Sequence, residues 1–250
     1  MRKVFLMLSV SLFSLNAEAA TCTPTPECAS LGYKYSLEEC ENMAVKCPNG
    51  DSYYCPSPRP KCNIGDIFYT DNTCVSADKY DSSKTALGVV VYVNPNGIGG
   101  QIMTSNSGIG KMLWRTKLVD TGLPIYSSSQ ENEAAQDFDS CGNTKRLIAA
   151  GTSEIFPAAW AAKSYAPTSE TAGKWCLPAA GIFRNISKNL ETIKNSFSKF
   201  GGITLVSCAW SSTVCAHIPA WISYFNYGVD GIGYSFYCGD YNAVHPVLEF

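Results

Sequence analysis

The sequence has little histidine and lacks the cysteine spacing of a compact metal site. Only His217 and His245 occur among 250 residues. The nearest cysteines, Cys22 and Cys28, are six positions apart, so no Cys-x-x-Cys zinc or redox motif is present. We therefore expect no metal and no other cofactor.

Concentrated positive charge is also lacking. Without the first nineteen residues, which carry Arg2, Lys3 and Glu18, the chain has 17 basic and 20 acidic residues. Proteins that bind nucleic acid or anionic membranes need clustered basic residues. The composition therefore argues against both partners.

No long hydrophobic run follows the N-terminus, where residues 1–19 have the pattern of a signal peptide. Arg2-Lys3 precedes an apolar stretch over 4–15, and Ala17-Glu18-Ala19 is a small-x-small cleavage site. The apolar stretch is too short for a permanent transmembrane helix. We expect an exported protein, secreted or located in the periplasm or at the cell surface, with no membrane insertion once the signal peptide is removed.

What the chain does have is cysteine, all of it beyond residue 19, which suits disulfides in an oxidising compartment. Seven cysteines precede residue 80 and five follow, so either one bridge crosses that boundary or each part keeps a free thiol. The spacing leaves the pairing open. The disulfide candidates are Cys22, Cys28, Cys40, Cys47, Cys55, Cys62, Cys74, Cys141, Cys176, Cys208, Cys215 and Cys238.

Residues 20–80 form a first region that is rich in cysteine and proline and poor in aliphatic periodicity. Such a short region buries little apolar surface and needs crosslinks, each worth about 2–4 kcal/mol. It is predicted to be a disulfide-linked module or a spacer. A polar linker then leads into a second domain over residues 85–250.

The second domain is organised around a predicted amphipathic helix over residues 178–200, which ends at Gly201-Gly202. Its apolar residues repeat at intervals of three and four, which places them on one helical stripe. Burial of seven such side chains does not by itself offset the conformational entropy that is lost when the helix becomes ordered. We therefore expect the helix to pack on a sheet. The stripe comprises Ile182, Phe183, Ile186, Leu190, Ile193, Phe197 and Phe200.

Strand-like segments lie on both sides of this helix. Residues 87–93 and 98–104 flank Asn94-Pro95-Asn96-Gly97 and predict a hairpin. A short helix is expected over 144–150, capped by Ser140 or Asn143, and another over 153–165. We expect the last strand to pair with the strand near Val90, in an α+β fold with helices on an antiparallel sheet. The later strands are predicted at 203–207, 209–212, 220–227, 233–237 and 243–250.

The residues that are candidates for catalysis or metal binding have simpler structural explanations. The sequence has no Gly-x-Ser-x-Gly motif, which would supply the nucleophile of a serine hydrolase for which either histidine could act as base. Asp137 and Asp139 faintly resemble a calcium loop, but helix capping explains them better. Cys208 and Cys215 are expected to form a structural bridge around Trp210-Ser-Ser-Thr213. We therefore expect no catalytic residue and no enzyme activity.

The exposed candidates for binding are aromatic. The C-terminal part is rich in aromatic residues with amide and hydroxyl neighbours, a composition that suits sugars or protein partners. Strand alternation is expected to bury either Trp221, Ser223 and Phe225 or their neighbours. The ligand-binding candidates are Tyr224, Tyr227, Tyr234 and Tyr241.

Two motifs together carry a resemblance to a known family. Gly-Lys-Trp175-Cys-Leu-Pro178 is followed by the long helix and then by Trp210-Ser-Ser-Thr213, Ala220-Trp221 and the terminal Val-His-Pro-Val-Leu-Glu-Phe250. Over residues 85–250 this order resembles the C-terminal domain of Lcl-type (Legionella collagen-like) bacterial adhesins, preceded here by a Cys-rich exported leader region. That family is grouped with C-type-lectin-like folds.

The resemblance implies a C-type-lectin-like domain with two helices on a small antiparallel sheet, paired terminal strands and a long loop region. It implies a secreted or cell-surface binding protein, adhesin-like, that recognises an extracellular glycan or protein without catalysis. Calcium-lectin signatures are absent, and Asn94-Pro95-Asn96 lies in a hairpin turn. Two alternatives remain open: an enzyme of the formylglycine-generating branch of that fold, and a structural component of the envelope or an appendage.

Overall fold

The computed structural model describes residues 44–46, 52–54, 60–95, 97, 99–104, 109–201, 208–216, 219–224, 231–233 and 240–250. The signal-peptide segment and the predicted strand at 203–207 lie outside them. The chain divides into two compact units, residues 1–58 and 59–250. In the first unit, β1 (Ala44–Lys46) and β2 (Ser52–Tyr54) pair antiparallel.

The boundary between the units lies near residue 58, earlier than the predicted boundary at 80. Residues 60–80 belong to the second unit because β3 (Ile67–Tyr69) pairs with β4 (Cys74–Val75) and with β5 (Ala86–Val93). Ile67, Phe68 and Tyr69 are all buried. The Cys62–Cys74 disulfide closes the β3–β4 turn.

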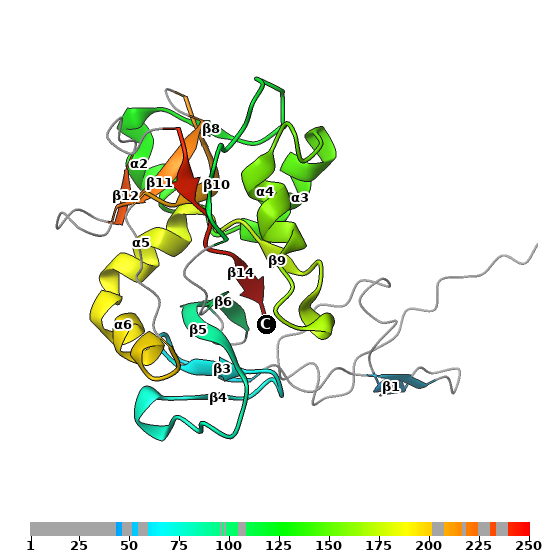
Figure 1. Cartoon of the computed structure of the whole chain (residues 1–250), viewed down its shortest axis with the longest axis vertical. Coiled ribbons are helices and arrows are strands. Elements are labelled where there is room, and N and C mark those ends of the chain that lie inside the picture. The colour runs from blue at the N-terminus through cyan, green and yellow to red at the C-terminus, as the bar shows by residue number, and fades with distance from the viewer. Residues whose placement is uncertain are drawn as a thin grey trace, which may run out of the picture. The chain divides into compact units, whose positions relative to one another are not determined.

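The larger sheet has six strands, in the order β4-β3-β5-β6-β14-β9 (Figure 1). The predicted hairpin is present: β5 pairs antiparallel with β6 (Gly100–Thr104), and Val90 lies opposite Ile102. The closing strand β14 (Val247–Glu249) pairs with β6 and β9 (Trp175–Cys176). The expected pairing of β14 with the strand near Val90 is therefore wrong, because β6 occupies that edge of β5.

The smaller sheet has four strands, in the order β12-β11-β10-β8. Its strands β10 and β11 are antiparallel, whereas β10 and β8 are parallel. A further pair, β7 with β13, joins the segment after β6 to the C-terminal segment. Mixed helices and mainly antiparallel sheets confirm the α+β class. The bounds are β7 (Lys111–Met112), β8 (Ile125–Tyr126), β10 (Trp210–Cys215), β11 (Ala220–Tyr224), β12 (Gly231–Gly233) and β13 (Asn242–Ala243).

The predicted long helix is two helices, α5 (Ala180–Lys188) and α6 (Leu190–Ser198), with a break at Asn189. The Asn189 side chain donates to the Asn185 carbonyl 2.8 Å away, a bond that competes with regular helix geometry. Asn185 in turn donates to the Val91 carbonyl of β5. Both helices contact β5.

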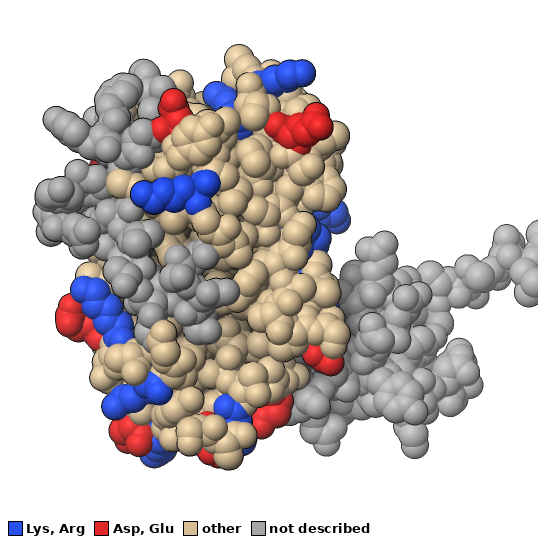
Figure 2. Space-filling view, viewed as in Figure 1, with Lys and Arg blue, Asp and Glu red and all other residues tan. Residues whose placement is uncertain are grey.

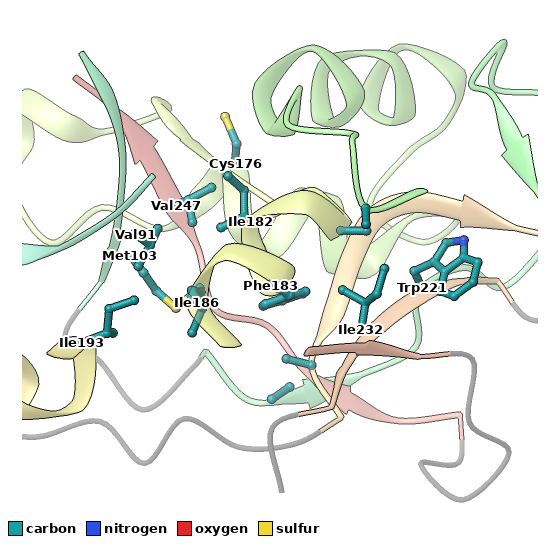
Figure 3. Close-up of a cluster of buried hydrophobic side chains, with 14 of the residues drawn as sticks. Val91, Met103, Cys176, Ile182, Phe183, Ile186, Ile193, Trp221, Ile232 and Val247 are labelled. Carbon is teal, nitrogen blue, oxygen red and sulfur yellow. The ribbon is translucent and has the colours of Figure 1, made fainter. Parts of the chain in front are cut away.

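The predicted apolar stripe does form the core. Five of its seven residues are buried, while Leu190 and Phe200 pack against it half-buried. α5 contacts β5 of the larger sheet and β10, β11 and β12 of the smaller one. Figure 3 shows Ile186 near Met103, whereas Phe183 points toward Ile232. The helix therefore packs between two sheets, as its all-apolar face requires.

Helices α3 (Ser140–Ala150) and α4 (Pro157–Ser164) lie at the β9 edge of the larger sheet, where they contact each other and β9. Both were predicted, although α3 begins four residues earlier and α4 four residues later. The other short helices among the described residues are α2 (Glu131–Ala134), η2 (Ala77–Lys79), η3 (Ser128–Gln130) and η4 (Ser169–Thr171).

Candidate functional site: a lysine-lined pocket beside a disulfide

The N-terminus of α3 is tightly anchored. Asp139 caps it by accepting a hydrogen bond from the Gly142 amide at 2.9 Å, so the predicted capping by the Asp137–Asp139 cluster is confirmed for Asp139. The predicted caps Ser140 and Asn143 are wrong, because the helix begins earlier and both lie within it. The buried Ser140 hydroxyl donates to Gln101 on β6 at 2.7 Å and accepts from the Ala179 amide at 2.9 Å. These bonds link the helix to the larger sheet and to the start of α5.

Two more contacts fix α3 against β9. The buried Thr144 hydroxyl accepts from the Leu177 amide at 2.9 Å and donates to the Ser140 carbonyl at 2.7 Å. The Cys141–Cys176 disulfide joins the first turn of α3 to β9 across 35 residues of sequence. Since α3 is held covalently and by satisfied hydrogen bonds, the surface beside it is preorganised.

Asp137 anchors the chain just before α3. Its carboxylate accepts from Asn143 at 2.8 Å and from the Thr213 hydroxyl of β10 at 2.7 Å. Its carbonyl accepts from the Gly181 amide of α5 at 2.8 Å. The carboxylate therefore connects structural elements rather than forming part of a calcium loop.

A pocket of about 720 Å³ opens beside this anchored segment. Positions 141, 144–145 and 148 follow helical spacing, so one face of α3 forms a wall. The remaining wall comes from α4, β14 and the segment that leads into β9. The lining residues are Cys141, Gly142, Thr144, Lys145, Ile148, Lys163, Gly173, Lys174, Cys176, Leu248 and Glu249.

The pocket carries an excess of positive charge. Lys145 on α3, Lys163 on α4 and Lys174 before β9 are all exposed, and they face one acidic lining residue, Glu249. Within the described part of the chain, none of the three lysines forms an ion pair. Elsewhere basic and acidic residues are scattered, as the face in Figure 2 shows. Three elements thus concentrate charge that the sequence as a whole lacks.

A second hollow of about 520 Å³ shares Lys174, Leu248 and Glu249 with this pocket. Glu170 lines it, and the pKa of this carboxyl is lowered by its own backbone amide first and then by the Ser169 and Thr168 hydroxyls. Attraction to Lys174 lowers this pKa further. Lys174 therefore lies within electrostatic reach of Glu170 as well as beside the pocket.

Of the four predicted tyrosines, the structure describes the side chain of Tyr241, which is 61% exposed. Tyr224 ends β11, while Tyr227 and Tyr234 lie outside the described residues. The predicted alternation along β11 is wrong at its start: Trp221, Ile222 and Ser223 are all buried. This strand is an inner strand of its sheet, and α5 also packs on it.

The cysteine predictions have mixed outcomes. Cys208 is disulfide-bonded, but Cys215 is a free thiol buried in the core, so the predicted Cys208–Cys215 bridge is wrong. The sequence left two explanations for the odd cysteine counts, a bridge across residue 80 or a free thiol on each side of it. The structure shows a free thiol in the part after residue 80. The candidates Cys22, Cys28, Cys40, Cys47, Cys55 and Cys238 lie outside the described residues.

His245 does not belong to the pocket lining. His217 lies outside the described residues, and His245 is fully buried between β13 and β14. Burial lowers the pKa of His245 to about 4. In the described segments no group of three or more His, Cys, Asp or Glu residues is placed to hold a metal ion. No described helix is long and apolar enough to cross a membrane.

The lysine pocket gives no local signal in the sequence because its members are far apart in the chain. Residues 145, 163 and 174 give no local cluster, and only folding brings α3, α4 and the approach to β9 together. A partial signal was present. Cys141, Lys145 and Ile148 share one helical face, and this spacing indicates a helix with a disulfide and a lysine on the same side.

Comparisons with known proteins give one informative likeness. No protein-family model matches the chain, and a search of curated proteins finds no match. The structure resembles the crystal structure of a fimbrial protein from Bacteroides ovatus, with a TM-score of 0.54 and 15% sequence identity. The match covers 76% of this chain and 49% of the fimbrial protein, so this chain spans about half of that protein's length.

At this identity the likeness shows a shared fold and nothing finer. The class defined by fold and site is thus an α+β, disulfide-crosslinked domain related in architecture to a fimbrial protein. It carries an open pocket lined by three lysines.

Proposed function

We propose that this chain is an exported binding protein of the cell surface or of a surface appendage, and that the lysine-lined pocket is its binding site. The observation that carries the proposal is the pocket itself. It is open, it is held by a disulfide and buried hydrogen bonds, and it gathers three lysines without ion-pair partners among the described residues. Rigid sites of this kind favour binding because little ordering cost remains.

Two further observations support an extracellular role. Disulfides persist in oxidising compartments; Cys62–Cys74 and Cys141–Cys176 are bridged among the described residues of the second unit, and Cys208 is disulfide-bonded as well. The protein with the similar structure is described as fimbrial. Its partner would be an extracellular glycan or protein, bound without catalysis.

The resemblance to Lcl-type adhesins points the same way, toward adhesion. The chain departs from the expected lectin-like pattern, however, since β14 pairs with β6 and β9. We therefore base the proposal on the pocket and treat C-type-lectin-like sugar binding as one form that it could take.

The test is retention on arrays of extracellular glycans and matrix proteins, with calcium present and then chelated, using the full mature chain. The pocket variant Lys145→Gln/Lys163→Gln removes two charges from two different elements. We expect it to reduce retention of the bound partner about tenfold or more, equivalent to about 1.4 kcal/mol.

The matched control is Lys111→Gln/Lys117→Gln, which removes the same charge from exposed positions outside the pocket lining. Retention by this control should equal that of the parent chain. Equal losses in both variants, or no retained partner at high protein concentration, would overturn the proposal and favour a structural appendage component.

A further inference from the structure

We infer that the pocket takes a carboxylate carried on a compact apolar body, such as an arylalkyl or short acyl acid. This ligand class rests on the proposed function, because it assumes that the pocket is a binding site. The carboxylate would lie among Lys145, Lys163 and Lys174, and the hydrocarbon would lie against Ile148, Leu248 and the disulfide.

The size of the pocket indicates a compact ligand. A volume of about 720 Å³ lies within the usual range of small-molecule sites, about 300–1,000 Å³. An open pocket of this volume has room for one aromatic ring or a short acyl chain. A long polymer would contact it with a single residue or end group.

The charge of the pocket selects an anion. Three ammonium groups from three separate elements face one carboxylate, that of Glu249, so the lining has a formal excess of two positive charges. An anion placed among the three ammonium groups is attracted by all of them. An ammonium group is also a strong donor to a carboxylate.

Two polar groups of the lining are already hydrogen-bonded within the protein, which argues against sugar recognition. The Thr144 hydroxyl is already engaged by the Leu177 amide and the Ser140 carbonyl, and the Gly142 amide is engaged by Asp139. Sugar hydroxyls need directional donors and acceptors, which these groups no longer supply. The lining then offers the charge of three lysines and the apolar surface of Ile148 and Cys141.

The apolar surface is a substantial part of the lining. Ile148 is half-buried and offers apolar surface to the pocket from α3, as does the half-buried Cys141 of the disulfide, whereas Leu248 and Cys176 are already nearly fully buried. Covering such surface favours an apolar ligand body at about 25 cal/mol per Å² of area removed from water. A bare inorganic anion would leave this contribution unused.

The experiment is calorimetric titration of the full mature protein with 4-phenylbutyrate, and with its uncharged analogue 4-phenylbutanamide. We expect the acid to bind at least about tenfold more tightly than the amide. Acetate and inorganic sulfate should bind much more weakly than 4-phenylbutyrate, because they lack the apolar body. If all anions bind alike, or if acid and amide bind alike, the inference is overturned.

The same carboxylate chemistry occurs at the C-terminus of a peptide that ends in phenylalanine. A second arm therefore compares Gly-Ala-Gly-Phe with a free carboxylate against the same peptide amidated. If the free-carboxylate peptide binds at least as tightly as 4-phenylbutyrate, the carboxylate of the natural ligand is a protein C-terminus. If only the small acid binds, the natural ligand is a free metabolite-like acid.

The variants locate the binding. Lys145→Gln/Lys163→Gln should weaken 4-phenylbutyrate binding about tenfold, whereas Lys111→Gln/Lys117→Gln should leave it unchanged. All four positions are exposed, so unfolding midpoints should stay close to that of the parent chain. Equal weakening by both pairs would contradict a pocket site.

Failure of this inference is distinguishable from failure of the proposed function. If the pocket variant loses an array partner while 4-phenylbutyrate fails to bind, the binding role stands and the ligand class is wrong. If 4-phenylbutyrate binds at the pocket but no extracellular partner is retained, the ligand class stands and the surface-binding role is wrong.

Discussion

His245 shows how a single residue takes its properties from its surroundings. It is fully buried, and neither ring nitrogen has a hydrogen-bond partner in the described part of the structure. A buried imidazole without partners is strongly biased toward its neutral form. Burial accordingly lowers the pKa of His245 from 6.5 to about 4.

This histidine should make folding stability depend on pH. In the unfolded chain His245 binds a proton near pH 6.5, whereas in the folded protein it does so near pH 4. Between these values the unfolded state binds more protons, so stability falls as the pH drops. The expected loss from this residue between pH 7 and pH 4 is about 3 kcal/mol.

Denaturant unfolding at pH 7 and pH 4 measures this contribution, with His245→Leu as the comparison. Leucine has a similar volume and no titrating group, so the variant should lose about 3 kcal/mol less than the parent chain over that range. Carboxyl groups titrate equally in both proteins and cancel in the difference. Identical losses of stability in the parent chain and in His245→Leu would contradict the assignment of this pH dependence to His245.

At the scale of elements, the α5–α6 pair depends on close approach to the segment before α3. Gly181 lies in the first turn of α5, and its amide donates to the Asp137 carbonyl. A methyl group at this position would collide with that same carbonyl and with the Phe138 ring. The glycine is therefore required by packing, although glycine is a poor helix former.

Gly181→Ala is expected to destabilise the protein by about 2 kcal/mol. Alanine favours helices by about 1 kcal/mol over glycine, but overpacking against a backbone carbonyl costs about 1–3 kcal/mol and distorts the contact with Asp137. The thermal unfolding midpoint measures the effect. Lys188→Ala, an exposed change in the same helix, should shift stability by no more than about 0.5 kcal/mol. If Gly181→Ala instead stabilises the protein, the contact with the Asp137 carbonyl adjusts without a cost in free energy, contrary to this prediction.

At the scale of the whole molecule, two disulfides link segments of very different separation. Cys62–Cys74 closes a short loop within one end of the larger sheet, whereas Cys141–Cys176 ties α3 to β9 across 35 positions. A crosslink restricts the unfolded chain more strongly when the loop that it closes is longer. The second bridge also forms part of the pocket lining.

Removing the two bridges separately should therefore give unequal losses. The chain-entropy relation gives about 4 kcal/mol for Cys141→Ser/Cys176→Ser and about 3 kcal/mol for Cys62→Ser/Cys74→Ser. Urea unfolding of the two double variants measures the order. Only the first pair should also weaken binding of 4-phenylbutyrate at the pocket. The reverse order of stability would indicate that α3 is held mainly by its hydrogen bonds.

The sequence by itself determined the local and periodic features of the second unit. The apolar repeat over 182–200 identified the helical stripe that became the core, and Asn94–Gly97 identified the turn of the β5–β6 hairpin. Asp139 was recognisable as part of a capping pair. These features depend on neighbours within a few residues, which is why local patterns report them.

Tertiary structure alone decided the partners of these elements. The place of β14 beside β6, the membership of residues 60–80 in the larger sheet and the free thiol of Cys215 each follow from contacts distant in the chain. The pocket is the clearest case, because its three lysines come from three elements that meet only after folding. Local sequence sets how a segment folds, but burial and charge at a site depend on what packs against it.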